Sequence, residues 1–324
     1  MKYRALGQTG LSVSEIGFGA WGIGGRTVNQ TSYGETDDRT SRAALARAYD
    51  CGITFFDTAA AYGNGHSEAL IGEALAGVRD KVVVATKAGY EAWDRPPDFS
   101  PTAIVASAER SLGRLRTDYI DVLLLHNAPL DVLQAADVRG ALDHLVTSGK
   151  VRAWGVSAKG PADALEALKV RGVAVVQANF NMMDVRALTS GLLEEVSRRG
   201  AGFVARTPLC FGFLSGTITR ATRFPPGDHR LGWPDVQLAN WIDGANDLLR
   251  VVSAAPGSEG VQAALRFCLS FAEISTTIPG ILSPDEAVEN AAASDLGPLP
   301  SKAVAAALEI NRGRQFFAAA AKAP

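Results

Sequence analysis

The sequence predicts an α/β protein, a single (β/α)₈ barrel of the TIM type, on three observations. Eight short runs rich in apolar and β-branched residues recur along the 324 residues, and helical patterns separate them. Strict alternation of strands and helices implies a parallel sheet, and eight such units favour a closed barrel over an open sheet. Gly17, Gly19 and Gly22 have the Gly-x-Gly-x-x-Gly spacing, but no helical pattern begins directly after them, which counts against a dinucleotide-binding open sheet.

Several of the expected strands are apolar throughout, as in a parallel sheet that is buried on both faces. They are Glu15–Phe18, Thr54–Asp57, Val82–Lys87, Ile120–His126, Ala153–Ser157, Val173–Asn179, Gly202–Thr207 and Ser275–Pro279. The clearest helical patterns are Thr40–Cys51, Pro101–Arg114, Pro161–Arg171 and Leu188–Arg199. Proline near a helix start and glycine after a basic helix end support these limits.

Two further segments have their own signatures. Met1–Val13 alternates around the turn Gln8-Thr9-Gly10 and predicts an N-terminal β-hairpin that closes the barrel floor. Gly212–Trp233 is long, irregular and rich in Gly, Pro and aromatic residues, which predicts a functional loop at the C-terminal face. No linker interrupts the pattern, so residues 1–324 are expected to form one domain.

Composition excludes several classes of protein. The chain is 47% hydrophobic and 20% charged with a net charge of -2, which is typical of a globular enzyme and unlike a nucleic-acid binder. It has no apolar stretch of membrane-spanning length, and its start lacks the apolar core of a signal peptide. Cys51, Cys210 and Cys268 are odd in number and far apart, which argues against disulfides and zinc and predicts a cytoplasmic protein.

Four reactive side chains follow or end neighbouring strands. They are Asp57, Tyr62, Lys87 and His126. Each alone has an ordinary structural explanation: a helix cap, a loop anchor, or a polar strand end. Barrel enzymes build their sites at the C-terminal ends of strands, however, and a lysine behind four apolar residues needs a partner such as Asp57.

Together these groups form a metal-free acid–base centre. The phenol of Tyr62 is a weak proton donor at neutral pH, and the Lys87 ammonium is expected to lower its pKa. Asp57 would keep Lys87 charged, and His126 would hydrogen-bond a substrate oxygen. Such a centre suits carbonyl reduction, in which negative charge develops on oxygen, with the hydride supplied by a cofactor.

At these residues the sequence resembles the aldo-keto reductase superfamily over nearly its whole length. The motifs that carry the resemblance occur in the family's order. They are Leu6–Ser14, Gly17–Gly22, Asp57–Gly63 with Gly65–Glu68, Lys81–Lys87, Tyr119–His126, Gly149–Arg152 and Gly155–Ser157. The resemblance implies an oxidoreductase that uses NAD or NADP, with Tyr62 as the general acid in reduction.

The resemblance also implies the cofactor contacts, position by position. They are Gly19, Ala20, Trp21, Asp57, Asn127, Ser157, Gln177, Arg206, Leu209, Gly212, Leu214, Gly216, Gly280, Ser283, Glu286, Glu289 and Asn290. The sequence departs from the family's pattern in three places. Ala158 replaces a frequent Asn, and Arg206 stands where many members stack Tyr or Trp under the nicotinamide. Leu282 and Glu286 replace basic residues that bind the NADP phosphate. The last departure predicts a preference for NAD(H), with NADP(H) as the alternative.

Substrate contacts are expected from aromatic and basic residues around the same strand ends. They are Trp21, Tyr62, Trp93, His126, Phe213, Arg230 and Trp233, and they suit a small carbonyl or sugar. Two other functions remain open from the residues alone. One is a different acid–base barrel enzyme, an isomerase or hydrolase; the other is a non-catalytic subunit that senses the cofactor.

Overall fold

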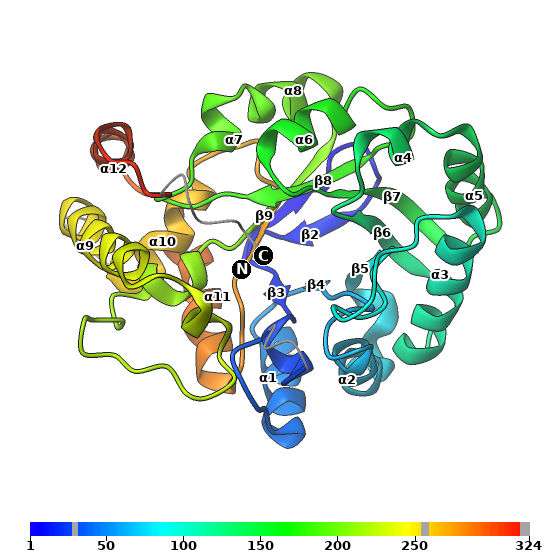
Figure 1. Cartoon of the computed structure of the whole chain (residues 1–324), viewed down its shortest axis with the longest axis horizontal. Helices are drawn as coiled ribbons and strands as arrows, with labels where there is room; N and C mark the ends of the chain where they lie inside the picture. Colours follow the sequence, from blue (N-terminus) through cyan, green and yellow to red (C-terminus); the bar gives the residue numbers. More distant parts are fainter. Residues whose placement is uncertain (28–31, 254–258, 318–324) are drawn as a thin grey trace.

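The predicted barrel is present in the computed structural model, which describes residues 1–27, 32–253 and 259–317 (Figure 1). Its parallel strands follow chain order around the sheet. They are β3 (Phe18–Gly19), β4 (Phe55–Asp57), β5 (Val83–Ala88), β6 (Ile120–His126), β7 (Val151–Ser157), β8 (Val175–Asn179), β9 (Gly202–Arg206) and β10 (Thr276–Ile278). Parallel bridges from Ile16 to Thr277 and from Gly19 to Gly280 join the two ends, so the sheet closes on itself.

Helices surround the strands, as alternating β and α units require (Figure 1). They are α1 (Asp38–Asp50), α2 (His66–Ala74), α3 (Pro101–Leu115), α4 (Leu130–Gln134), α5 (Ala136–Thr147), α6 (Pro161–Ala167), α7 (Arg186–Thr189), α8 (Leu192–Arg199), α9 (Asp235–Val252), α10 (Gly260–Leu269), α11 (Pro284–Leu296) and α12 (Ser301–Gly313). None of the helices in the described ranges is long and apolar enough to cross a membrane.

Element limits differ from the sequence prediction where local backbone geometry intervenes. Strand β6 has the predicted bounds, whereas the first barrel strand, Phe18–Gly19, overlaps the predicted Glu15–Phe18 only at Phe18. The predicted helix Leu188–Arg199 is two helices, because Gly191 adopts a left-handed φ of 80° between α7 and α8. The predicted helix Pro161–Arg171 is wrong in its last turn, since α6 ends at Ala167.

The N-terminal hairpin closes the floor of the barrel, as predicted. Strands β1 (Tyr3–Ala5) and β2 (Ser12–Ser14) pair antiparallel. The backbone amide of Gln8, in the turn between them, donates to the Gly200 carbonyl at the floor. Leu6 and Val13 are fully buried in the cluster that fills the barrel interior. The other members come from the strands themselves: Phe55, Val83, Ala85, Val122, Leu124, Val175, Val204 and Ile278. Packed side chains therefore fill the barrel near its floor, and the polar groups lie at the C-terminal ends of the strands.

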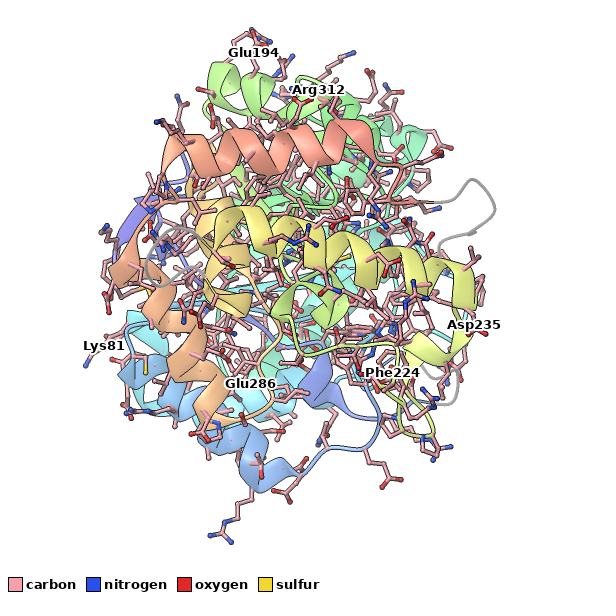
Figure 2. The ribbon with its side chains drawn as sticks, turned by 90° about the vertical axis from the view of Figure 1, so that its left-hand side faces the viewer. Lys81, Glu194, Phe224, Asp235, Glu286 and Arg312 are labelled. Carbon is pink, nitrogen blue, oxygen red and sulfur yellow. The ribbon has the colours of Figure 1, made fainter. Side chains whose placement is uncertain are left out.

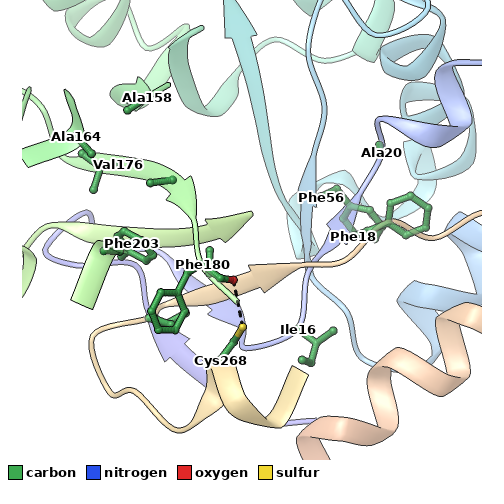
Figure 3. Packing of buried hydrophobic residues seen from close by; sticks show 14 of the residues in the cluster. Ile16, Phe18, Ala20, Phe56, Ala158, Ala164, Val176, Phe180, Phe203 and Cys268 are labelled. Atoms are coloured by element: carbon green, nitrogen blue, oxygen red, sulfur yellow. Dashed lines mark hydrogen bonds between the residues drawn. The ribbon is translucent and has the colours of Figure 1, made fainter. Parts of the chain in front are cut away.

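A second, larger apolar layer joins the barrel to its helices. Phe18 stacks on Phe56 with ring centroids 5.7 Å apart, and Phe180 contacts Cys268 of α10, whose thiol donates to the Phe180 carbonyl (Figure 3). Helices α9 and α12 lie side by side on the face seen in Figure 2. This packing fixes the strand ends from outside, so side chains that project from them have defined positions.

Candidate active site

The four reactive side chains singled out in the sequence meet at the C-terminal end of the barrel. Asp57 ends β4, Lys87 lies one residue before the end of β5, and His126 ends β6. Tyr62 comes from the loop after β4. Lys87 Nζ donates to Asp57 Oδ1 at 2.6 Å and to Tyr62 Oη at 3.2 Å. The Tyr62 and His126 rings meet edge to face with centroids 6.0 Å apart.

The ion pair of Lys87 and Asp57 is buried, so each charge depends on the other. Lys87 is fully buried and Asp57 is 2% exposed. A third acceptor, the carbonyl of Thr58, receives a hydrogen bond from Lys87 Nζ at 2.8 Å. Burial alone would lower the pKa of Lys87, but Asp57 and Tyr62 outweigh it and raise that pKa, so the ammonium remains charged.

The pKa of Tyr62 corrects one expectation. Burial raises it above its ordinary value, and the opposing effect of the Lys87 ammonium is smaller. Lys87 therefore stabilises the phenolate as expected, but the phenol remains protonated throughout the neutral range. A protonated phenol beside an ammonium suits a proton donor.

His126 is neutral at the same location. Burial, followed by the charges of Lys87 and Arg206, lowers its pKa well below the ordinary value. Its Nδ1 atom is buried and meets no hydrogen-bond partner among the described residues. Tyr90 and Trp93 pack edge-on against the imidazole, with centroids 5.7 and 5.1 Å away. A neutral ring with spare hydrogen-bonding capacity can form a hydrogen bond to an oxygen atom.

A hydrogen-bond chain across the barrel extends this centre. His126, Ser157 and Gln177 lie level with one another on β6, β7 and β8. Ser157 Oγ donates to Gln177 Oε1 at 2.9 Å, and Gln177 Nε2 donates to Asp57 Oδ2 at 2.6 Å. Sequence reasoning missed the contact between Gln177 and Asp57, because they are 120 positions apart and belong to opposite sides of the barrel.

Comparisons with known proteins agree with this geometry. The profile described as the aldo/keto reductase family matches residues 15–312. The chain belongs to the aldo/keto reductase family. Members named as reductases and dehydrogenases are among its relatives, and it is accordingly an oxidoreductase that acts on C=O or CH–OH groups, in a family that uses NAD(P)H.

Two relatives and one solved structure bear on its function. The NADH-specific methylglyoxal reductase of Escherichia coli is 30% identical, over 91% of this chain and 94% of that protein. A probable voltage-gated potassium channel subunit beta of rice, Oryza sativa subsp. japonica, is also 30% identical, over 92% and 93%. The glycerol dehydrogenase of Gluconobacter oxydans superposes with a TM-score of 0.79 at 26% identity, covering 98% and 97% of the two chains.

The residues expected at the nicotinamide end surround the acid–base centre. Gly19 lies beside β10, and a Cβ there would come within 2.9 Å of the Ile278 and Pro279 carbonyls, so close strand packing already requires this glycine. The following amide, of Ala20, donates to Asp57 O. Trp21 packs against Tyr33 and His229, two neighbours that sequence reasoning missed. Asn127 adopts a left-handed φ of 54° directly after His126.

The residues expected at the adenosine end fit a polar ligand in two respects. Asn290 is 2% exposed, and its Nδ2 atom has no hydrogen-bond partner in the part of the chain that the structure describes. A Cβ on Gly280 would meet no atom of residues 1–27, 32–253 and 259–317 within 4 Å, so these residues leave space beside the backbone there. Glu289 is exposed, and its carbonyl accepts from Gln262 at 2.5 Å.

Glu286 has a structural role at the start of α11 (Figure 2). Its Oε2 accepts from the Leu282 amide at 2.6 Å, and its own amide donates to Ser283 Oγ at 3.2 Å. This reciprocal arrangement resembles a capping box. One carboxylate oxygen of Glu286 is engaged in it.

The loop after β9 differs in part from what its sequence predicted. Leu209 is half-buried, Gly212 and Gly216 adopt left-handed φ values of 93° and 78°, and Leu214 is fully buried. Phe213 is 1% exposed and packs on Trp241, so its ring belongs to the core beneath the loop. The connection from β9 to α9 forms a wide loop outside the ring of helices (Figure 1).

Arg230 of this loop is already paired. Its guanidinium binds Asp228 at 2.6 Å, donates to the Phe211 carbonyl and lies over the rings of Tyr33 and Phe224. Arg230 thus joins the loop to the segment after β3, and its contacts explain it without a substrate. Trp233 packs edge-on against Trp241 with centroids 4.7 Å apart.

Proposed function

We propose that the chain catalyses reversible hydride transfer between a nicotinamide cofactor and a small carbonyl or sugar, with Tyr62 as the general acid in reduction. The observation that carries the proposal is the buried hydrogen-bond chain from Asp57 through Lys87 to the Tyr62 phenol, with neutral His126 beside it. A fixed proton donor next to a fixed positive charge is what a carbonyl oxygen needs as negative charge develops on it.

Each side chain has a defined part in this scheme. Tyr62 Oη gives its proton to the carbonyl oxygen, and the Lys87 ammonium stabilises the phenolate that remains. Asp57 keeps Lys87 charged and oriented. His126 donates a second hydrogen bond to the same oxygen. The cofactor, when bound, supplies the hydride.

The cofactor would lie along the edge formed by β7 to β10. Ser157 and Gln177 would hold the carboxamide, while Gly280 and Asn290 would border the adenosine. The orphaned Asn290 amide and the open space beside Gly280 support this assignment. Trp93 packs against His126, and Trp93 and Trp21 are the proposed substrate contacts. The scattered free cysteines support a cytoplasmic location.

We further propose a preference for NAD(H). Leu282 carries no charge and Glu286 is acidic, and no basic residue occurs between Phe271 and Leu299. A carboxylate repels the 2′-phosphate of NADP(H) and accepts a hydrogen bond from the free 2′-hydroxyl of NAD(H). The NADH-specific relative points the same way.

The test is a panel of aldehydes, ketones and aldoses assayed with both cofactors in both directions. Turnover of at least one substrate, with kcat/KM higher for NAD(H), is the expected result. A tenfold or greater preference for NADP(H), about 1.4 kcal/mol, would contradict the cofactor assignment. Absence of turnover together with tight NAD(P)H binding would favour a cofactor-sensing subunit, the alternative that similarity to the rice channel subunit raises.

A further inference from the structure

Arg206 holds a position at the site that the acid–base scheme does not use. It is the last residue of β9, and its Nη2 donates to the carbonyls of Ala158 at 2.9 Å and Lys159 at 3.4 Å. The guanidinium therefore reaches across β8 to the residues that follow β7. The next residue, Thr207, adopts a left-handed φ of 59° and donates to Asn179 Oδ1 at 2.7 Å, which fixes the local backbone.

The charge of Arg206 is not neutralised locally. Its buried Nε has no hydrogen-bond partner within residues 1–27, 32–253 and 259–317, and no carboxylate of these ranges forms an ion pair with it. Arginine remains protonated in proteins. Lys87 and Asp57 cancel one another, whereas His126 and Tyr62 are neutral. The site therefore carries one net positive charge, and that charge is on Arg206.

The field of this charge reaches the reacting groups. Arg206 contributes to lowering the pKa of His126, and it opposes the rise in the pKa of Tyr62. The acid–base groups come from β4, β5 and β6, whereas Ser157, Gln177 and Arg206 come from β7, β8 and β9. A nicotinamide ring held by Ser157 and Gln177, beside a carbonyl at Tyr62 and His126, would therefore lie on the side of the barrel that carries Arg206.

We propose that Arg206 makes this site distinguish the oxidation states of the cofactor, so that NADH binds more tightly than NAD⁺. The inference rests on the proposed function. The nicotinamide ring of NAD⁺ carries a positive charge and that of NADH does not, while the rest of the two molecules is the same. An unpaired guanidinium opposes the charged ring and can still stack on the neutral one. The site would therefore release NAD⁺, the cofactor product of carbonyl reduction, more easily than NADH.

The experiment measures Kd for NADH and NAD⁺, by quenching of protein fluorescence and by calorimetry, without any substrate. Wild type is compared with Arg206→Gln, which keeps a polar side chain but removes the charge, and with Arg206→Lys, which keeps the charge. Arg198→Met removes one exposed positive charge from α8, far from the strand ends, and is the matched control. Circular dichroism establishes that each variant is folded.

The ratio of Kd for NAD⁺ to Kd for NADH is expected to exceed one in wild type. It should fall about tenfold, equivalent to about 1.4 kcal/mol, in Arg206→Gln and stay within about threefold of wild type in Arg206→Lys and Arg198→Met. Binding of both nucleotides with an unchanged ratio in Arg206→Gln would overturn the role of Arg206. Failure of wild type to bind either nucleotide would instead overturn the proposed function.

Discussion

Removing the Lys87 ammonium tests how the buried ion pair supports both folding and proton transfer. In Lys87→Met, Asp57 keeps the hydrogen bond from Gln177 but loses its only ion-pair partner in the described residues. Asp57 is 2% exposed and Lys87 fully buried, so the variant leaves an uncompensated charge away from water. Breaking a buried pair in this way costs about 3–5 kcal/mol of the free energy of unfolding. The Asp57→Asn variant leaves the Lys87 ammonium buried without its ion-pair partner, and it should lose a similar amount of the free energy of unfolding.

The double variant separates stability from activity. Asp57→Asn with Lys87→Met removes both charges, and such replacements are often close to neutral. We therefore expect its stability to lie within about 2 kcal/mol of wild type, which means a coupling energy of several kcal/mol between the two positions. Its kcat should remain as low as that of the single variants, because the ammonium that contacts the Tyr62 phenol oxygen is absent.

Urea denaturation followed by fluorescence gives the four stabilities, and steady-state kinetics gives the four activities. Arg79→Met is the control for activity, since Arg79 pairs with fully buried Asp121 at the start of β6, at the opposite end of the strands, where Asp121 also keeps its pair with Arg152. It should lose stability and keep its kcat. Additive losses of stability in the double variant, or a double variant with wild-type kcat, would refute the reasoning.

Three other outcomes follow from the structure. Tyr62→Phe removes only the phenol oxygen and should lower kcat by about 10²–10⁴-fold while NADH binding and the melting temperature stay unchanged; a kcat above about a tenth of wild type would assign the proton to another group. Glu286→Arg should shift the ratio of kcat/KM values toward NADP(H), and an unchanged ratio would mean that this position does not face the ribose; Asp285→Arg, on the exposed neighbouring residue, is its control. Burial lowers the pKa of His229 to about 4, below its unfolded value of about 6.5, so this group contributes stability that is present above pH 6.5 and is lost as the pH falls toward 4. His229→Phe should therefore lose less stability than wild type over that range in denaturation curves, and an equal loss would contradict the assignment.

The features that were predicted correctly from the sequence are those that depend on a local pattern of residue types. Strand β6 has the predicted bounds because its apolar residues are buried on both faces and His126 ends the run. The hairpin was predicted by its turn, and its place at the floor is explained by the burial of Leu6 and Val13 inside the barrel. The barrel, once predicted, brought Asp57, Lys87 and His126 to one end, because parallel strands all point the same way.

Features that depend on contacts between distant segments were not predictable. Gln177 reads as an isolated amide in a strand, and nothing local indicates that it donates to Asp57 across the barrel. Phe213 and Arg230 have the residue types of substrate contacts, yet packing on Trp241 and pairing with Asp228 explain them. The net pKa of Tyr62 depends on how far burial outweighs a neighbouring charge, and that balance requires the folded structure.

The central claim is that hydride passes from a nicotinamide cofactor to a carbonyl carbon at the Tyr62 centre. Its most direct test uses NADH deuterated at C4, one stereoisomer at a time, with the best carbonyl substrate from the panel. Mass spectrometry should find one deuterium on the product carbon from one of the two stereoisomers, with at least about 100-fold slower transfer in Tyr62→Phe. A product without deuterium from either stereoisomer, or equal transfer rates in wild type and Tyr62→Phe, would contradict the account.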